Sequence, residues 1–276
     1  MYSPRDYWSR LARDFAQSDA AGLAPVLHPG APGWYNAVID RLQARAWAPA
    51  LALCKLPPNA RVLDVGCETG RWLRRLEQGG LTPFGSDRTV GMLQLAAGRV
   101  PARLACAEGQ RLPFPPDAFD AVTSVTAIQH IPPPEQPVAI DELVRVLRPG
   151  GYLVLFELIR GQGQHIFLHS PDRWVAQLRS RGLTLLGWFG QEFLLFDRAL
   201  TGAVHGTRRA FHPGLSETLP DEASAMQTAD SGASLSKRMY CAMRRMAVSA
   251  SVLLEPLAER ICPGLWATHG VFIFRK

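Results

Sequence analysis

The chain has 276 residues, of which 47% are hydrophobic and 20% are charged, so it is long enough to bury one large core and to carry an additional element. No run of about 18 uncharged apolar residues occurs, and residues 1–15 are charged and aromatic where a secretory signal peptide needs an apolar segment. These features argue against a membrane-spanning or exported chain and predict a cytoplasmic protein.

The net charge of +6 is compatible with binding to nucleic acid or to an anionic membrane. Arginine is, however, spread along the whole chain in short clusters that lie far apart in the sequence. We therefore interpret the charge as that of a basic, solvated surface.

The cysteines are odd in number and scattered, without a CxxC pair or histidines at ligand spacing. A disulfide framework or a zinc site needs such regular spacing. We expect reduced thiols and no metal ion, at Cys54, Cys67, Cys106, Cys241 and Cys262.

From Val62 onward, short apolar runs alternate with helical stretches, which predicts βαβ units and a parallel sheet. One predicted helix ends in "LRPGG", with Val138, Leu143, Val144 and Leu147 on its apolar face. A strand from Tyr152 to Leu158 is expected to follow. The remaining segments of this alternation read "RVLDVG", "RWLRRLEQGG", "TPFGSD", "VGMLQLAAGRV", "ARLACAE" and "AFDAVTSVTAI".

Beyond residue 158 the alternation continues for one more unit and then stops. Ser170 is the expected N-cap of a helix with Pro171 at its first position, and "LTLLGWF" is the expected next strand. A Ser/Ala/Asp/Gly-rich stretch at 216–236 predicts a mobile loop, and 237–260 is helix-prone. The terminal "GVFIFRK" predicts a final strand.

Together these elements predict an α/β fold, doubly wound around a mostly parallel seven-stranded sheet. An N-terminal helical extension (1–55) precedes the core (56–196). A helical cap (197–264) is inserted before the last strand (265–276).

The segment "DVGCETG" follows the first predicted strand, and ligands of open parallel sheets bind beyond the carboxyl ends of the strands. Asp87, at the end of the second strand, stands where an acidic residue bonds ribose hydroxyls. Glu68 replaces a glycine in this loop and would place negative charge beside phosphates, which argues against a dinucleotide. A nucleoside that carries a cation instead of phosphates, S-adenosylmethionine (SAM), tolerates a carboxylate there.

At this point the sequence resembles the class I, Rossmann-like SAM-dependent methyltransferases, in particular the small-molecule group known as methyltransferase type 11. The resemblance covers about residues 62–158. It rests on the order of "VLDVGCETG", "AEGQRLPF", "FDAVTSVTAIQHI" and "ELVRVLRPGGYLVLFE".

The resemblance implies SAM as the cofactor and S-adenosylhomocysteine (SAH) as its product. Asp64 and Gly66 are implied to surround the amino acid moiety, Asp87 to bond the ribose, and Glu108 to face the adenine amino group. Tyr35 is implied to reach the methionyl carboxylate. The full implied cofactor set is Tyr35, Asp64, Gly66, Cys67, Gly70, Asp87, Arg88, Glu108, Gly109, Gln110 and Val125.

Glu68 is the main departure from the family pattern. If SAM binds, we expect residue 68 to have φ < 0 and its side chain to point toward solvent or toward the cationic end of the cofactor. The alternative is that Glu68 obstructs the pocket and the protein is a degenerate enzyme.

His130 lies just past the fourth strand of the predicted sheet, where an acceptor must approach, and an imidazole with a pKa near 6.5 suits proton removal from a hydroxyl. The alternative is that His130 bonds the backbone of its turn. The stretch "TAIQ" lacks the aromatic residue with which nucleic-acid amino-methyltransferases stack a base, so nucleic acid is not the expected acceptor. The candidate substrate contacts are Trp34, Gln129, Trp188 and Gln191.

The leading hypothesis is O-methylation of a small molecule such as a sugar or a secondary metabolite. The alternative acceptor is a quinone or a lipid-linked molecule, because basic and apolar residues alternate in 237–260 as in a helix that contacts a membrane. A third hypothesis is a non-catalytic methyltransferase-like subunit. The chain is expected to be a monomer or a homodimer.

Overall fold

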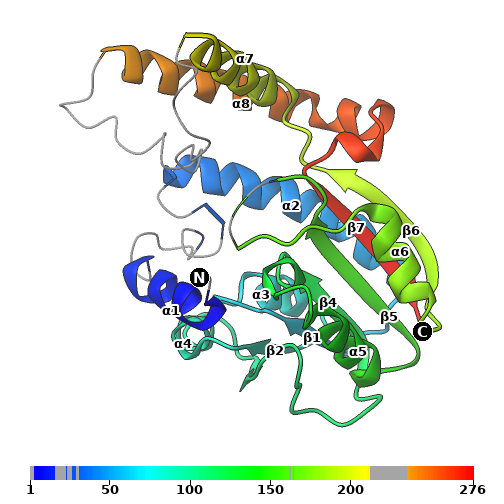
Figure 1. Ribbon diagram of the computed structural model, residues 1–276. Helices are drawn as coiled ribbons and strands as arrows, with labels where there is room; N and C mark the ends of the chain where they lie inside the picture. Colours follow the sequence, from blue (N-terminus) through cyan, green and yellow to red (C-terminus); the bar gives the residue numbers. More distant parts are fainter. Residues whose placement is uncertain are drawn as a thin grey trace.

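A computed structural model describes residues 3–15, 23, 27–28, 31–161, 163, 165–211 and 235–276. Its centre is a seven-stranded sheet in the order β3-β2-β1-β4-β5-β7-β6 (Figure 1). Only β7 runs antiparallel to its neighbours, so the predicted α/β fold with a mostly parallel sheet is confirmed. The strands are β1 (Arg61–Val65), β2 (Thr82–Asp87), β3 (Arg103–Cys106), β4 (Phe119–Val125), β5 (Leu147–Leu158), β6 (Thr184–Gln191) and β7 (His269–Arg275).

Helices cover both faces of this sheet, and a further helical pair, α7 and α8, lies outside α2 (Figure 1). The helix α1 lies beside α4, near the N-terminus. The helices are α1 (Pro4–Phe15), α2 (Gly33–Cys54), α3 (Arg71–Gln78), α4 (Val90–Ala97), α5 (Gln136–Val146), α6 (Pro171–Arg179), α7 (Leu195–Phe211) and α8 (Leu235–Ile261). Two 3₁₀ turns, η1 (Ile128–His130) and η3 (Gly264–Trp266), complete the described elements.

Alternation of side chains along the strands builds two hydrophobic cores, one on each face of the sheet. In β1, Leu63 and Val65 belong to the core covered by α5 and α6, whereas Val62 belongs to the core covered by α2, α3 and α4. Successive residues of a strand point to opposite faces, so a strand buried on both sides reads as a continuous apolar run. This is why β1 could be found in the sequence.

Two expectations for the segment around residue 147 are wrong. The helix α5 ends at Val146, and "LRPGG" already belongs to β5, because Pro and Gly end a helix but are tolerated where pairing is irregular, as it is between β4 and β5 here. Val138 is 49% exposed. The face of α5 that packs on the sheet instead carries Ala139, Ile140, Leu143 and Val146.

Other local predictions are confirmed. Ser170 accepts a hydrogen bond from the backbone N–H of Arg173 and Pro171 begins α6. The predicted helix at 237–260 lies within α8. The loop predicted at 216–236 lies outside the described residues as far as residue 234, and α8 begins at Leu235.

Polar contacts buried between α7 and α8 hold this helical pair together. The Glu255 carboxylate accepts hydrogen bonds from the backbone N–H groups of Phe193 (2.7 Å) and Leu194 (3.2 Å), just before α7 begins. The Ser251 hydroxyl accepts from the N–H groups of Phe196 and Asp197. Since the first N–H groups of a helix have no partner within the helix, α8 supplies the N-terminal cap of α7.

Glu255→Ala should lower the free energy of unfolding by about 2–4 kcal/mol, because it leaves two buried N–H groups without an acceptor. Thermal or urea unfolding measures this change. The control is Glu259→Ala, one turn further along α8, which removes only an ion pair with Arg45 and should cost less than about 1 kcal/mol. Equal effects of the two substitutions would contradict the capping role.

Candidate cofactor-binding site

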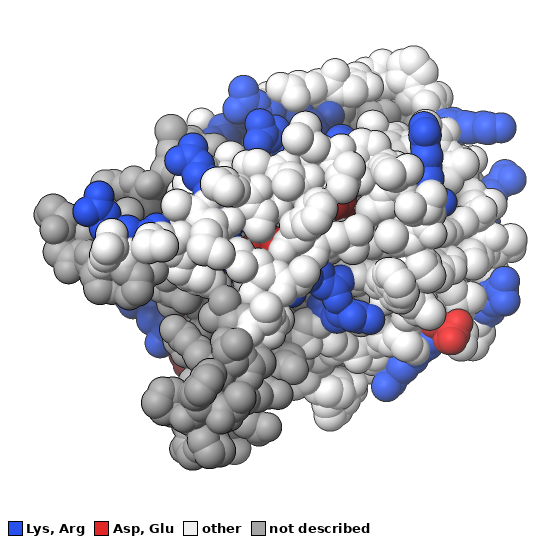
Figure 2. Space-filling model, turned by 90° about the horizontal axis from the view of Figure 1, so that it is seen from above, with Lys and Arg blue, Asp and Glu red and all other residues white. Residues whose placement is uncertain are grey.

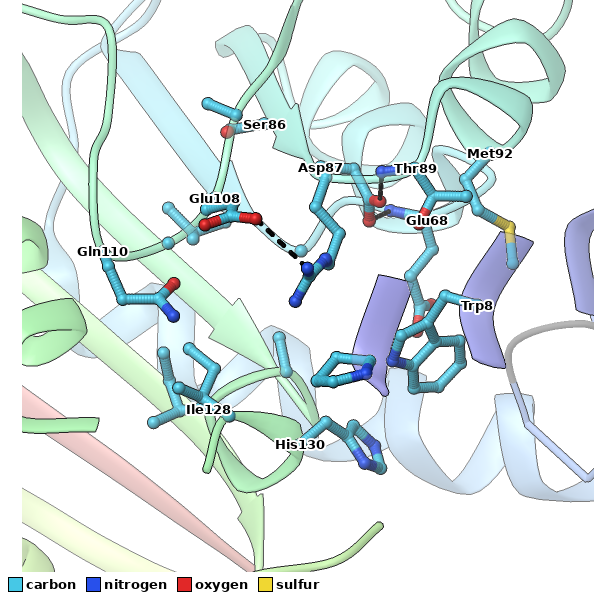
Figure 3. A pocket seen from close by; sticks show the side chains of 18 of the residues that line it. Trp8, Glu68, Ser86, Asp87, Thr89, Met92, Glu108, Gln110, Ile128 and His130 are labelled. Carbon is cyan, nitrogen blue, oxygen red and sulfur yellow. Dashed lines mark hydrogen bonds and ion pairs between the residues drawn. The ribbon is translucent and has the colours of Figure 1, made fainter. Parts of the chain in front are cut away.

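A pocket lies at the carboxyl edge of the sheet, where β1, β2, β3 and β4 end (Figure 3). Its empty space, with the solvent at its mouth included, amounts to about 680 Å³. Helix α1 closes one side with Pro4 and Trp8. The other lining residues are Val65, Gly66, Glu68, Ser86, Asp87, Arg88, Thr89, Met92, Ala107, Glu108, Gly109, Gln110, Thr126, Ala127, Ile128, His130 and Ile131.

The loop after β1 is tightly constrained. Gly66 has φ = 79°, and a Cβ atom at this position would lie 2.4 Å from the Cβ of Ala127, so only glycine fits. Glu68 has φ = 50° and is 8% exposed. The expectation that residue 68 has φ < 0 and a solvent-directed side chain is therefore wrong.

A long-range hydrogen bond accounts for the conformation of Glu68. Its backbone N–H donates to Asp87 Oδ2 over 3.0 Å, while Asp87 Oδ1 accepts from the N–H of Thr89 over 2.8 Å. The bond draws the loop against the end of β2 and directs the Glu68 side chain along the pocket toward Trp8 (Figure 3). The cost of a left-handed residue, about 1–2 kcal/mol, is offset by this contact.

Three buried carboxyl groups, those of Asp64, Glu68 and Asp87, meet at this loop. Burial raises the pKa of Asp64 to about 7, and it raises the pKa of Glu68 and of Asp87 as well. The Asp87 carboxylate also raises the pKa of Asp64 and of Glu68, and buried Arg71 offsets part of the effect on Glu68. Such a cluster is unfavourable for a phosphate and favourable for a cation or for hydroxyl and amino donors.

The opposite end of the pocket carries polar groups from the ends of β2 and β3. Arg88 lies 3.1 Å from Glu108, so the one pocket-lining arginine is already paired with a carboxylate. Gln110 donates to Glu135. The Ser86 hydroxyl is buried and has no hydrogen-bond partner among the described residues. A ligand with hydroxyl and amino groups fits this end.

Four rings gather where β4 ends. His130 lies 4.9 Å from Trp8 and 5.2 Å from His165, which stacks on Tyr7 at 4.6 Å (centroid distances). His130 Nδ1 lies 2.9 Å from the carbonyl oxygen of His165, which can only accept, so Nδ1 carries the hydrogen. His130 Nε2 is then an acceptor and lies 3.3 Å from the Gln129 amide nitrogen. Burial lowers the pKa of His130 to about 4.

The turn that carries His130 is anchored from β5. The buried carboxyl group of Glu157 accepts hydrogen bonds from the N–H groups of Ile128 and Gln129, and Gln129 Oε1 accepts from the N–H of Leu158. Burial raises the pKa of Glu157 to about 8. Thr126 has φ = 53° and donates its N–H to the carbonyl of Phe156. Gln129 thus holds the turn, and the structure does not place it among the pocket-lining residues.

Seven of the residues selected from the sequence line this pocket. They are Gly66, Asp87, Arg88, Glu108, Gly109, Gln110 and His130.

Four further candidates do not line the pocket but pack beneath the loops that form it. Asp64 is 1% exposed and binds the Thr123 hydroxyl, and Cys67 and Val125 lie in the core on the α2 side. Gly70 precedes α3 with φ = 81° and packs against Ala96.

The remaining candidates lie away from the pocket. Tyr35 is buried between α2 and α8, where the guanidinium of Arg244 lies 5.5 Å from the centre of its ring. The guanidinium of Arg245 lies 5.5 Å from the centre of the Trp34 ring. Trp188 stacks on Phe272 within the sheet at 5.6 Å. Gln191 is 1% exposed at the end of β6, beside the His269–Glu192 pair.

Some pocket residues were missed by sequence reasoning. The candidates selected from the sequence do not include Trp8, Pro4, Thr89 or Met92. Helix α1 is brought over the pocket by Leu11 and Ala12, which pack against Met92 of α4. No local signal in the sequence predicts where a short N-terminal helix will dock.

Comparison with known proteins places this site in a family. Residues 63–155 match the model of a methyltransferase domain. A demethylmenaquinone methyltransferase of Mycobacterium tuberculosis (strain ATCC 25618 / H37Rv) is 34% identical over 123 residues, which cover 44% of this chain and 51% of that protein. The human "Probable tRNA methyltransferase 9B" is 32% identical over 117 residues, or 42% of this chain and 25% of that protein. The chain thus spans about half of the length of the mycobacterial relative and a quarter of the length of the human one.

Solved structures share the fold at low identity. The [4+2]-cyclase SpnF has a TM-score of 0.52 and 20% identity, with 84% of this chain and 80% of that chain covered. Phosphoethanolamine N-methyltransferase 2 of Haemonchus contortus, solved in complex with SAM, has a TM-score of 0.54 and 18% identity, with 100% of this chain and 60% of that chain covered. From the domain match and the site geometry, we conclude that residues 63–155 form a methyltransferase domain of the class I, Rossmann-like SAM-dependent type.

Proposed function

We propose that this protein binds SAM in the pocket at the carboxyl edge and transfers its methyl group to an oxygen of a small molecule. The observation that carries the proposal is the position of the buried carboxyl cluster beside the ring-lined wall at the end of β4. The carboxyl groups suit a cationic donor, and the rings suit an apolar or aromatic acceptor.

The pocket offers a partner for each part of SAM. Asp87 has lone pairs left on both oxygens after its two backbone bonds, so it can still accept from ribose hydroxyls. Glu108 and Gln110 stand at the end where an adenine would lie, and Glu68 extends toward the opposite end. When bound, SAM supplies an electrophilic methyl group on a sulfonium, and the chain's own contribution is to align the acceptor with it.

The proposed base is His130. Its Nδ1 hydrogen is held by the carbonyl oxygen of His165, which leaves Nε2 as the unprotonated nitrogen, 3.3 Å from the Gln129 amide nitrogen. An imidazole with a pKa of about 4 is neutral across the physiological range and is always ready to accept, but it is a weak base. The acceptor that fits best is therefore an acidic hydroxyl, such as that of a phenolic secondary metabolite, rather than a sugar hydroxyl.

Two other acceptors have some support. A quinone or lipid-linked acceptor is the alternative favoured by the apolar exposed face of α8 and by the similarity to a demethylmenaquinone methyltransferase. A tRNA acceptor is suggested by the similarity to a tRNA methyltransferase, but η1 carries no Phe, Tyr or Trp on which a base would stack. The third hypothesis is a non-catalytic subunit, which titration of the protein with SAM tests.

Glu68→Gly should leave the affinity for SAM within about tenfold, or 1.4 kcal/mol, because glycine adopts the same backbone conformation at lower cost. The same substitution should raise the free energy of unfolding by about 1 kcal/mol. Titration calorimetry and urea unfolding measure the two effects. A gain in SAM affinity far beyond tenfold would show that Glu68 obstructs the pocket, and the absence of SAM binding to both forms would refute the enzymatic function.

His130→Phe should lower turnover by about 10²–10⁴-fold while SAM affinity changes little, because the ring is kept and only the proton acceptor is lost. The assay follows SAH release with a panel of phenols, sugars, short-chain quinols and tRNA. Between pH 7 and pH 5 the wild-type rate should not fall through protonation of His130, because the pKa of its imidazole is about 4. A parallel loss of folding stability and activity would instead assign His130 a purely structural role.

A further inference from the structure

Exposed apolar side chains are concentrated on the helical cap between β6 and β7. Among the described residues, the large apolar side chains exposed elsewhere are only Leu53, Val90, Val138 and Leu186. All the others belong to α7, α8 and η3. A contiguous exposed apolar surface on one element marks an interaction site rather than ordinary surface composition.

Most of these side chains form one stripe along α8. Met246 is 71% exposed, Leu253 80% and Ile261 69%. Steps of three, four or seven residues keep side chains on the same side of a helix with 3.6 residues per turn, so the stripe runs along most of α8, a length of about 40 Å. Its members are Leu235, Met239, Met243, Met246, Leu253, Leu254, Leu257 and Ile261.

The stripe cannot turn inward, because the opposite side of α8 is fixed by buried polar contacts. Arg244 is 2% exposed and lies 2.9 Å from Asp197 of α7. Ser251 and Glu255, both 1% exposed, cap the start of α7. Breaking these contacts would leave buried charges and N–H groups without partners.

Positive charge borders the stripe. Arg238, Arg245 and Arg260 are exposed and, at 3.6 residues per turn, lie on the same flank of α8. The exposed carboxylate of this helix, Glu259, is paired with Arg45 of α2. Figure 2, which views the molecule from the side of α7 and α8, shows Lys and Arg side chains spread over this face and few acidic ones.

We infer that α8 is a membrane-docking helix whose apolar stripe enters the interface of an anionic lipid bilayer, with the arginine flank against the headgroups. An apolar stripe beside a basic flank is the pattern of helices that lie in the plane of a membrane surface. The part of the chain that the structure describes holds no helix long and apolar enough to cross a bilayer, so the contact is peripheral.

A second copy of the chain fits this face less well. In a two-fold symmetric pair, the same patch meets itself, so the arginine flanks of both copies would be brought close together. An anionic bilayer complements both features at once, since it accepts the apolar side chains and neutralises the charge. The inference does not depend on the proposed function.

The test is co-sedimentation of the full chain with vesicles of phosphatidylcholine and phosphatidylglycerol, compared with phosphatidylcholine alone. The wild type should bind the anionic vesicles, and higher salt should weaken the binding. Met246→Glu combined with Leu253→Glu should abolish it. The matched control, Val138→Glu combined with Leu186→Glu, changes two exposed apolar residues outside the cap and should bind as the wild type does.

Arg238→Gln combined with Arg260→Gln should weaken binding to anionic vesicles by about thirtyfold, because each arginine near an anionic surface contributes about a factor of five. SAM affinity, measured on each variant, should be unchanged. This readout separates loss of docking from loss of the fold or of the cofactor site.

Absence of wild-type binding to anionic vesicles at low salt would overturn the inference. So would equal binding by the stripe variant and its control. Sedimentation velocity completes the test: a dimer that the stripe substitutions dissociate, with no vesicle binding, would assign the face to self-association.

Discussion

The hydrogen bond from the backbone of Glu68 to the carboxylate of Asp87 is the contact on which the candidate site depends. It joins the loop after β1 to the end of β2 and holds residue 68 in the left-handed region. Because the loop is drawn so close, the carboxyl groups of Asp64, Glu68 and Asp87 share one poorly solvated region and their pKa values rise. A pocket built in this way is suited to a cationic ligand, which would stabilise the charged form of these carboxyl groups.

The rest of the molecule places an acceptor beside this charge. Glu157 fixes the turn after β4 from the neighbouring strand, so His130 has one orientation. The Trp8 ring, from the other end of the chain, lies 4.9 Å from it and closes the wall. Left-handed residues occur at the carboxyl ends of β1, β4 and β6, at Glu68, Thr126 and Glu192. At Glu68 and Thr126, which line the pocket, this strain persists because the surrounding contacts over-determine the backbone.

The fold could largely be predicted from the sequence, because alternating apolar runs and helical periods are local signals. The position of the "GCETG" loop at the end of β1 and of Asp87 at the end of β2 followed from the same pattern, whereas Glu108 was implied by the family resemblance. The conformation of Glu68 could not be predicted, because it is set by Asp87, 19 residues away. The position of Tyr35 could not be predicted for a similar reason: its neighbours on α8 lie far along the chain, and they bury it beneath the cap. The ring-lined wall also depends on distant residues, since Tyr7 and His165 are 158 positions apart.

The central claim is that the pocket holds buried carboxyl groups whose ionised form is stabilised by a cationic cofactor. Proton release on binding, measured by calorimetry in buffers of different ionisation enthalpy, tests it most directly. Because burial raises the pKa of Asp64 to about 7, this carboxyl group is partly protonated near pH 7, and a nearby sulfonium lowers its pKa and that of Glu68. We predict that SAM binding near pH 7 releases protons, that SAH with its neutral sulfur releases fewer, and that Glu68→Gln reduces the difference. Equal proton release by SAM and SAH, or none by either, would contradict this account of the site.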